Sequence, residues 1–395
     1  MKRVKRVTRV TSVRAVKGAQ MVLSVDADDR AARGRRGQAE GLTEGLARVL
    51  VMALFGLVLL VVLFLASLVL GARPVAVSTA VEALFAYDGG LVDHIVIVDY
   101  RLPRTLLSLL CGMAFGVSGA LIQAATRNPL ADPGILGVNA GAAFCVTLVV
   151  GLFGVQSINV YLWFALLGAV LVTLCVYGLA LAGGMTGEGM TGGGMAGGSM
   201  AGRGGVTPVR LVLAGVALSA MLGGIGSSVT LLNPQAFDAM RQWSIGSVAG
   251  RDMDVVVAVA PCIGLGLAIA LMSARSLNAV ALGEDLARAL GASLVRTRIL
   301  TLVAVTLLAG AGTAACGPIG FVGLMVPHVV RWLTGPDQRL IIPMVMIYAP
   351  ILLLAADIAG RLVLYPGELE AGIVTAFLGA PVLIALARRR QAGGL

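Results

Sequence analysis

The sequence is poor in charged residues, and this scarcity excludes a soluble globular protein. Asp, Glu, Lys and Arg make up 13% of the 395 residues, whereas about 25% is usual for a soluble domain. Apolar residues reach 58%, and the mean hydropathy is +0.94. The formal net charge is +10, but twelve of the 30 Lys and Arg residues precede residue 49. Cations beside a membrane span set topology, so we expect no nucleic-acid partner.

Titratable groups are missing from most of the hydrophobic body of the chain. No Asp, Glu, Lys or Arg occurs in residues 133–187, 211–237, 255–274 or 299–327, and the chain has two histidines. A membrane enzyme would need clustered carboxylates, histidines or a nucleophile with its base. An ion-coupled carrier usually keeps such groups near mid-membrane. The sequence therefore indicates that the chain is not an enzyme. It weakens the ion-coupled carrier, although sodium coupling through backbone carbonyls stays open.

Lysine and paired cysteine are missing as well. The last lysine is Lys17, and a phosphate-binding P-loop needs a lysine at its end. If transport uses ATP, a separate subunit must therefore hydrolyse it. The five cysteines lie inside apolar runs and form no CxxC pair, so they predict small packed side chains. We expect no metal site and no cofactor.

Long apolar runs are what the sequence does contain, and a helix crosses a bilayer core with about 20 such residues. Ten runs predict ten transmembrane helices, near residues 49–71, 105–125, 134–154, 158–182, 208–232, 253–274, 296–316, 319–333, 340–360 and 371–387. With the N-terminus in the cytoplasm, the cytoplasmic segments hold 24 Lys and Arg residues and the outer ones hold six. This asymmetry predicts a multi-pass protein of the cytoplasmic membrane with both termini inside.

Two polar segments stand apart from these spans. Residues 1–48 are interpreted as a disordered basic cytoplasmic arm that can touch anionic membrane lipid, ahead of a transmembrane domain at residues 49–391. Residues 183–205 form a Gly/Met-rich cytoplasmic loop with four pentads, GGMTG, EGMTG, GGMAG and GSMAG. Methionine sulfur is a ligand for Cu(I), but four separate thioethers on a flexible Gly-rich chain favour an insertion over a metal site. A modulatory role of this loop stays open.

The longest cytoplasmic loop between spans, residues 276–298, predicts a short amphipathic helix. Leu282, Leu286 and Leu290 fall on one helical face, and Glu284 pairs with Arg288 at i,i+4. Glycines at 283 and 291 can end a helix on either side. Such a helix suits the groove of a partner protein or, as the alternative, the lipid interface.

Three long motifs resemble the signatures of the FecCD-type permeases. The first is residues 101–143, which include TRNPLADPGILGVNAGA, and the second is GPIGFVGLMVPHVVRWLTGPD at 317–337. The third is LLLAADIAGRLVLYPGELEAGIVTAFLGAP at 352–381. The resemblance covers about residue 50 to the C-terminus, and the first motif is most similar to the iron–siderophore members. Glu370 departs from the family, which usually has proline there.

The resemblance implies an all-α, ten-helix permease of the type II ATP-binding cassette importer architecture. It implies two permease subunits around one pathway, as identical copies or related paralogues. Two cassette ATPase subunits and an extracytoplasmic substrate-binding protein are the other implied partners. The expected cargo is an iron(III)–siderophore, with haem and cobalamin open within the family. An ATP-independent secondary carrier is the alternative of a different class.

The resemblance also implies three sets of functional residues. Arg101, Arg104 and Arg361 match arginines that pair with glutamates of the binding protein, although interfacial anchoring or a local pair of Asp357 with Arg361 is the structural alternative. The segment expected to contact the ATPase is Gly283, Glu284, Asp285, Leu286, Ala287, Arg288, Ala289, Leu290 and Gly291. The expected pathway residues are Thr207, Ser219, Gly223, Gly224, Ser227 and Ser228, for which close helix packing is the alternative.

Overall fold

The computed structural model describes residues 45, 47–71, 73–155, 157–186, 208–364 and 367–392. The predicted arm before residue 45, most of the Gly/Met-rich loop and Thr207 lie outside the described residues. The chain divides into two compact units, residues 1–55 and 56–395.

Seven described helices are long and apolar enough to cross a membrane. They are Ala47–Val69, Val92–Thr126, α6 (Ile158–Thr186), α7 (Pro208–Leu232), α9 (Met253–Ala281), α11 (Leu294–Cys316) and α13 (Gln338–Val363). Two shorter apolar helices are α5 (Val138–Phe153) and α14 (Ala371–Ala392), and the 13-residue α12 (Val322–Thr334) corresponds to the short run predicted at 319–333. These ten helices agree with the predicted ten-helix architecture, and seven of them are long enough to cross a membrane.

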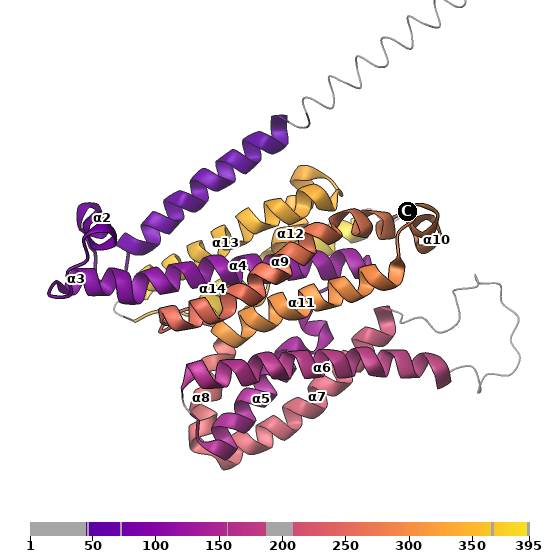
Figure 1. The fold of residues 1–395 in the computed structure, drawn as a ribbon, viewed down its shortest axis with the longest axis horizontal. Coiled ribbons are helices and arrows are strands. Elements are labelled where there is room, and N and C mark those ends of the chain that lie inside the picture. Colours follow the sequence, from indigo (N-terminus) through magenta and orange to yellow (C-terminus); the bar gives the residue numbers. More distant parts are fainter. Residues whose placement is uncertain are drawn as a thin grey trace, which may run out of the picture. The chain divides into compact units, whose positions relative to one another are not determined.

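Short helices mark the two ends of the bundle. The helix Val92–Thr126 consists of α3 (Val92–Ile95), a π-helical segment η1 (Val96–Arg101) and α4 (Leu102–Thr126). Together with α2 (Val77–Phe85) and α8 (Pro234–Ile245), α3 lies at one end, and α10 (Glu284–Ala289) lies at the other (Figure 1). We call these the α8 end and the α10 end. The sequence did not predict α2, α3 or α8.

Helix α4 lies at the centre of the unit, where it packs against α9, α11, α12 and α13. Glycines allow this close packing. A Cβ atom on Gly119 would lie 1.8 Å from the carbonyl oxygen of Gly323 on α12, and one on Gly112 would lie 2.6 Å from Cα of Pro350. No side chain fits in such gaps. These glycines therefore let the helix backbones touch.

Helix α7 is packed quite differently. In its most apolar stretch 11% of the residues are buried, against 78% for the helix that contains α4. It touches α5, α6 and α8 along one face, and the rest of its surface is open, with apolar side chains such as Met221 and Ile225 exposed. Its remaining surface is therefore available to lipid or to another protein.

Two proline-containing breaks interrupt the helices. The first follows α4, where Arg127 is left-handed at φ 52° and Pro133–Leu136 form a 3-10 turn, η2. The second separates α11 from α12 at residues 317–321. The two breaks meet at a cavity of about 30 Å³ lined by Asp132, Gly134 and Gly320. Around this cavity Pro133 and Ile319 are buried, whereas Arg127 and Gly320 are exposed, so the unit encloses only part of the irregular backbone.

Candidate functional site

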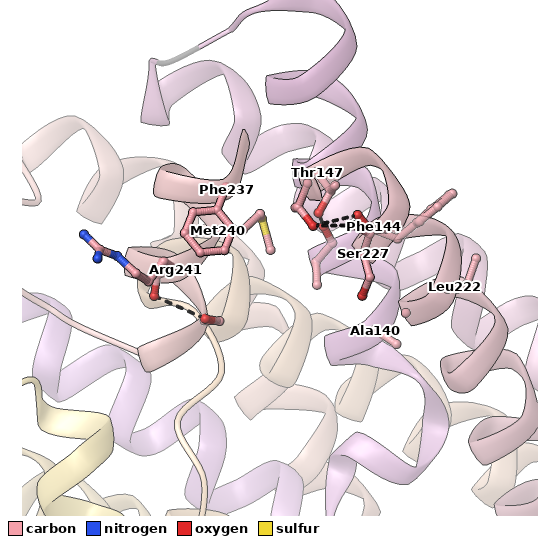
Figure 2. A pocket seen from close by; sticks show the side chains of 13 residues that line it. Ala140, Phe144, Thr147, Leu222, Ser227, Phe237, Met240 and Arg241 are labelled. Atoms are coloured by element: carbon pink, nitrogen blue, oxygen red, sulfur yellow. Dashed lines mark hydrogen bonds between the residues drawn. The ribbon is translucent and has the colours of Figure 1, made fainter. Parts of the chain in front are cut away.

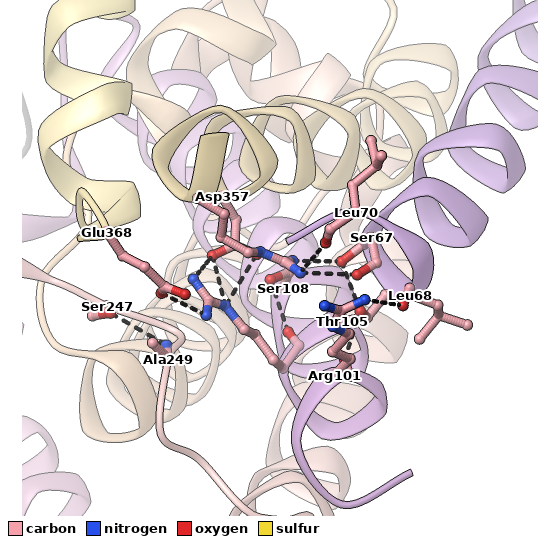
Figure 3. A network of polar contacts seen from close by, with 12 residues as sticks. Ser67, Leu68, Leu70, Arg101, Thr105, Ser108, Ser247, Ala249, Asp357 and Glu368 are labelled. Atoms are coloured by element: carbon pink, nitrogen blue, oxygen red, sulfur yellow. Dashed lines mark hydrogen bonds and ion pairs between the residues drawn. The ribbon is translucent and has the colours of Figure 1, made fainter. Parts of the chain in front are cut away.

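An arginine cluster occupies the α8 end of the bundle and joins three helices. We define it as Arg101, Arg104, Asp357, Arg361 and Glu368 (Figure 3). Arg104 donates from Nε and Nη2 to Oδ1 of Asp357, at 2.9 and 2.8 Å, and from Nη1 to Oε2 of Glu368 at 2.8 Å. One guanidinium therefore links α4 to α13 and to the segment before α14.

The other two arginines of the cluster hold the end of the first helix. Arg361 donates to the carbonyl oxygen of Ser67 at 2.8 Å, to its hydroxyl at 2.6 Å, and to Asp357 Oδ2 from Nε at 3.1 Å. Arg101 donates to the carbonyl oxygens of Leu68 and Val69, each at 2.8 Å, and also to that of Arg73. The last carbonyls of a helix have no partner within it, so these arginines supply their hydrogen bonds.

Exposure separates the members of the arginine cluster. Asp357, Arg361 and Arg101 are 1%, 3% and 7% exposed, whereas the side chains of Arg104 and Glu368 are 12% and 39% exposed. The arginines of the cluster nevertheless line one cavity of about 290 Å³, together with Arg73, Arg251 and Glu368. Five arginines and one glutamate line it, and two further carboxylates pair with three of these arginines: Asp357 with Arg104 and Arg361, and Asp93 with Arg73. The cavity therefore keeps a net positive charge, which attracts carboxylate groups.

The structure thus brings together the three arginines predicted to dock a binding protein, and it also contains the local pair of Asp357 with Arg361. The sequence did not predict Ser67 or Glu368 as their partners. Ser67 lies in an unbroken apolar run, which gives no signal of a hydrogen-bonding role. Glu368 lies two residues after Pro366 in the third motif. Its signal in the sequence was an acidic side chain at the same end of the spans as the three arginines. The docking role itself stays a prediction.

The loop at residues 276–298 has the geometry that the sequence predicted. Helix α10 is flanked by Gly283 at φ 118° and Gly291 at φ 79°, a left-handed region that favours glycine. Ala287 is buried against Val280 and Leu294. The three leucines of the predicted apolar face lie outward: Leu282, Leu286 and Leu290 are 63%, 48% and 61% exposed.

Charged side chains fix this loop to the next span. Glu284 accepts a hydrogen bond from Arg298 Nη2 at 2.5 Å and lies 3.7 Å from Arg288, the predicted i,i+4 partner. Asp285 also pairs with Arg288, at 3.3 Å. The Glu284–Arg298 pair ties the N-terminus of α10 to α11, so the loop and that span are held in one orientation. The sequence reading found Arg288 and missed Arg298.

The residues predicted to line a pathway divide into three groups. Gly223 and Ser227 line a cavity of about 380 Å³ between α5, α7 and α8 (Figure 2). Gly224 and Ser228 are on the open surface of α7. Ser219 instead packs near the start of α5, with its hydroxyl 3.8 Å from a Cβ built on Gly137.

Helix α8 supplies part of this cavity, and the sequence did not predict it. Phe237, Met240, Arg241 and Ser244 line the cavity opposite Phe144 and Thr147 of α5. The available signal was Asn233-Pro234, because asparagine caps helices and proline begins them. In the structure the Asn233 side chain accepts hydrogen bonds from the backbone N–H groups of Gln235 and Ala236.

Comparison with known proteins adds three findings. The FecCD transport family matches residues 59–389. The chain is 45% identical to the ferric enterobactin transport system permease protein FepD of Escherichia coli (strain K12), over 87% of this chain and 97% of that protein. It is 36% identical to the iron(3+)-hydroxamate import system permease protein FhuB of Bacillus subtilis (strain 168), over 87% of this chain and 84% of that protein.

A solved structure has the same fold. It is a metal-chelate type ABC transporter in an inward-facing conformation, with a TM-score of 0.69 and 25% identity, and the match covers 85% of this chain and 98% of that one. The match extends over nearly the whole of the solved chain, so the similarity concerns the complete helical architecture and not one motif.

Proposed function

The chain belongs to the FecCD transport family, and from this membership we propose that it is the permease subunit of an importer that carries an iron(III)–siderophore across the cytoplasmic membrane, driven by ATP hydrolysis on a separate subunit. The observation that carries the proposal is the 45% identity to a ferric enterobactin permease along 97% of its length. The ten-helix bundle supports it, because it is the architecture of a metal-chelate ABC transporter.

The ATPase partner is proposed to bind at the α10 end. No lysine follows Lys17, so the spans and their loops cannot hold a P-loop. Leu282, Leu286 and Leu290 present an exposed apolar face on a loop fixed by the Glu284–Arg298 pair. An exposed apolar ridge of this kind suits the groove of a partner. Two cassette subunits, one beneath each permease copy, complete this proposal, with the α10 end and both termini in the cytoplasm.

The binding protein is proposed to dock at the α8 end through the arginine cluster. Its cavity is lined by five arginines and one glutamate, and Arg104 reaches the half-exposed Glu368. We expect a carboxylate of the binding protein to enter the cavity and to compete with Glu368 for Arg104. Arg101 and Arg361 contribute positive charge and hold the helix ends, because their donors are occupied by buried acceptors.

The translocation pathway is proposed to run along the open side of α7. A second permease copy, identical or paralogous, would cover this helix, which packs against its own subunit along one face only. Gly223, Gly224, Ser227 and Ser228 then form a polar, uncharged wall. Such a wall makes no strong bond with a bulky chelate, and an importer must release its cargo.

Transport in proteoliposomes tests the function. The permease is reconstituted with its ATPase and binding protein, and uptake of ⁵⁵Fe-loaded siderophore is measured with internal or external ATP and with vanadate. We expect uptake that needs ATP on the α10 side and stops with vanadate or with an ATPase whose P-loop lysine is replaced. Uptake that persists without ATP would identify a secondary carrier, and preference for haem or cobalamin over every iron–siderophore would refute the proposed cargo.

Two substitutions of opposite expected sign test the docking surface. Arg104→Gln removes the partner of the incoming carboxylate, so affinity for the binding protein should fall by about tenfold, the usual value of a charge-assisted pair. Glu368→Gln removes the internal competitor, so affinity should rise. Binding is measured by surface plasmon resonance on nanodisc-held permease. A loss of affinity in both variants, or no change in either, would contradict this assignment.

A further inference from the structure

A second large cavity lies at the α10 end of the bundle. Its volume is about 340 Å³, within the roughly 300–1,000 Å³ that is usual for small-molecule sites. Its walls come from α4, η2, α6, α7, α9, α10 and α11. None of the described residues predicted for the pathway or for binding-protein docking lines it. The functions proposed above therefore leave this cavity without a role.

The cavity is polar at its mouth and apolar inside. Arg127 follows the last residue of α4 and is exposed, and Arg298 lies near the start of α11. Ile122 and Val305 line the cavity deeper on the same two helices and are 4% and 0% exposed. At 1.5 Å per residue, Val305 lies about 10 Å beyond Arg298 along the helix axis. A molecule with a polar head and an apolar chain matches this gradient.

One hydroxyl group in this cavity lacks a hydrogen-bond partner. Thr301 lines the cavity and is 4% exposed, and its Oγ1 atom is buried without a partner among the residues that the structure describes. The hydroxyls of Thr297 and Thr126, which also line the cavity, donate to carbonyl oxygens one turn earlier, at 2.9 and 2.6 Å. Buried polar groups are almost always paired. The Thr301 hydroxyl therefore points to an occupant of the cavity that completes its hydrogen bond.

The charges of the cavity favour a negative head group on that occupant. Arg127 and Arg298 line it, and Glu284 is the one acidic residue among its described lining residues. The bond to Glu284 uses one of the five N–H donors of the Arg298 guanidinium. Arg298 and Thr301 are three residues apart on α11, so they lie on the same face of that helix. An oxyanion that enters the cavity can therefore bind both side chains and compete with Glu284 for Arg298.

We infer that this cavity is a regulatory site that takes one acyl chain with an anionic head group. The chain lies among the apolar residues deeper in the cavity, and the head group accepts hydrogen bonds from Thr301 and Arg298. The Glu284–Arg298 pair ties α10 to α11, so a head group that takes Arg298 from Glu284 loosens α10. Occupancy then lowers the stimulation that α10 transmits to the ATPase. Binding depends on the cavity alone, whereas this effect on the ATPase rests on the proposed function.

Photolabelling of the full-length permease in phosphatidylcholine nanodiscs tests the site. The probe is a decanoate that carries a diazirine, unlabelled decanoate is the competitor, and labelled peptides are identified by mass spectrometry. We expect displaceable labels on the segments of α4, α9 and α11 that line the cavity. Thr301→Val should weaken decanoate binding by about tenfold, the usual effect of losing a hydrogen bond to a charged group. Decyltrimethylammonium has a similar chain and the opposite charge, so it should not compete.

Thr306→Val is the matched control for this substitution. Thr306 is buried on the same helix, but its hydroxyl donates to the carbonyl oxygen of Leu302 at 2.8 Å and it does not line the cavity. This variant should bind decanoate as the parent does. Thr301→Val removes a hydroxyl that has no internal partner, so its unfolding temperature should equal or exceed that of the parent, and misfolding would not explain weaker binding.

Three results would overturn the inference. The first is the absence of displaceable label in the cavity, which would leave water as its occupant. The second is equal decanoate binding by the parent and Thr301→Val. The third is an equal loss of binding in Thr301→Val and Thr306→Val, which would show a general effect on α11 in place of a contact with the ligand.

Lipid composition distinguishes the two sources of such a chain, a free fatty acid and an anionic lipid of the bilayer. Part of the phosphatidylcholine is replaced by phosphatidylglycerol, and labelling by the decanoate probe is compared. Unchanged labelling supports the site with a free fatty acid as its ligand. Labelling that falls in the parent and not in Thr301→Val supports the same site with one chain of the anionic lipid as its occupant.

ATPase measurements separate this regulation from the proposed function. In the assembly of permease, ATPase and loaded binding protein, decanoate should lower the stimulated ATPase activity several-fold, and Thr301→Val should need about tenfold more decanoate for the same loss. If the loaded binding protein does not stimulate the ATPase of the parent assembly, the proposed function fails, and photolabelling still decides whether the site exists. If stimulation is normal and bound decanoate does not lower it, the proposed function stands and the regulatory role is wrong.

Discussion

Replacing Asp357 with asparagine should destabilise the protein more than any other single change in the arginine cluster. Asp357 is 1% exposed and accepts hydrogen bonds from both Arg104 and Arg361. The near-isosteric amide removes the negative charge and leaves two buried guanidinium groups facing one another. Removing one partner of a buried ion pair costs about 3–5 kcal/mol. For a domain of this size such a loss lowers the unfolding midpoint by roughly 5–15 °C.

Glu368→Gln is the control for this prediction. Glu368 contacts the same Arg104, but its side chain is 39% exposed, and a solvent-exposed pair contributes about 1 kcal/mol or less. The double variant Asp357→Asn/Arg361→Gln removes one of the stranded charges and should recover part of the loss. Thermal unfolding is followed by tryptophan fluorescence in nanodiscs at one scan rate. Equal midpoint shifts for Asp357→Asn and Glu368→Gln would refute the reasoning, because burial would then make no difference.

Three further predictions concern the helix contacts and the α10 end. Gly119→Ala should sharply lower the yield of folded protein, because its Cβ would lie 1.8 Å from a backbone oxygen, whereas Gly224→Ala, with nothing within 4 Å, should fold normally in size-exclusion profiles. Glu284→Arg should reduce the stimulation of ATPase activity by the loaded binding protein, and the double variant Glu284→Arg/Arg298→Glu should restore this stimulation. A double variant with stimulation as low as that of Glu284→Arg would contradict a role for this pair. Deleting residues 183–202 should leave iron uptake within about twofold of the parent, as expected for the insertion predicted from the sequence. A large loss would assign the Gly/Met-rich loop a function.

The ten spans could be predicted because hydrophobicity and length decide whether a helix crosses a bilayer. The fifth run, 208–232, coincides with α7, and the glycines at 283 and 291 correctly bounded α10. Hydrophobicity and length do not identify the short helices at the ends of the bundle. Helix α8 has a mixed composition and depends on the Asn233 cap and on packing of Trp243, which is 4% exposed. No apolar run marks such a helix.

The site was predictable in part for a similar reason. Arg101, Arg104 and Arg361 were identified through the resemblance to the FecCD-type permeases, and all three lie at the ends of spans, where charge is rare. Their acceptors were harder to find, because most are backbone carbonyls of the first helix, which every residue has. The pathway residues on α7 are all small serines and glycines, so the sequence does not distinguish them. Their exposure depends on where α5 and α8 lie. Ser219 and Ser227 therefore differ in the structure and not in the sequence pattern.

The π-helical segment Val96–Arg101 constrains how this part of the chain can vary in length. The backbone N–H of Leu102 bonds to the carbonyl oxygen of Ile97, five residues back, so the segment holds one residue more than an α-helix would. Losing that residue would restore α-helical spacing and turn α3 by roughly 100° relative to α4. Because Arg101 holds the end of the first helix and the backbone of Arg73, Asp93 on α3 would move away from Arg73 and their ion pair would break. Descendants of this sequence can therefore exchange exposed side chains here, such as Tyr100, whereas the gain or loss of a single residue would displace the helices that precede the segment.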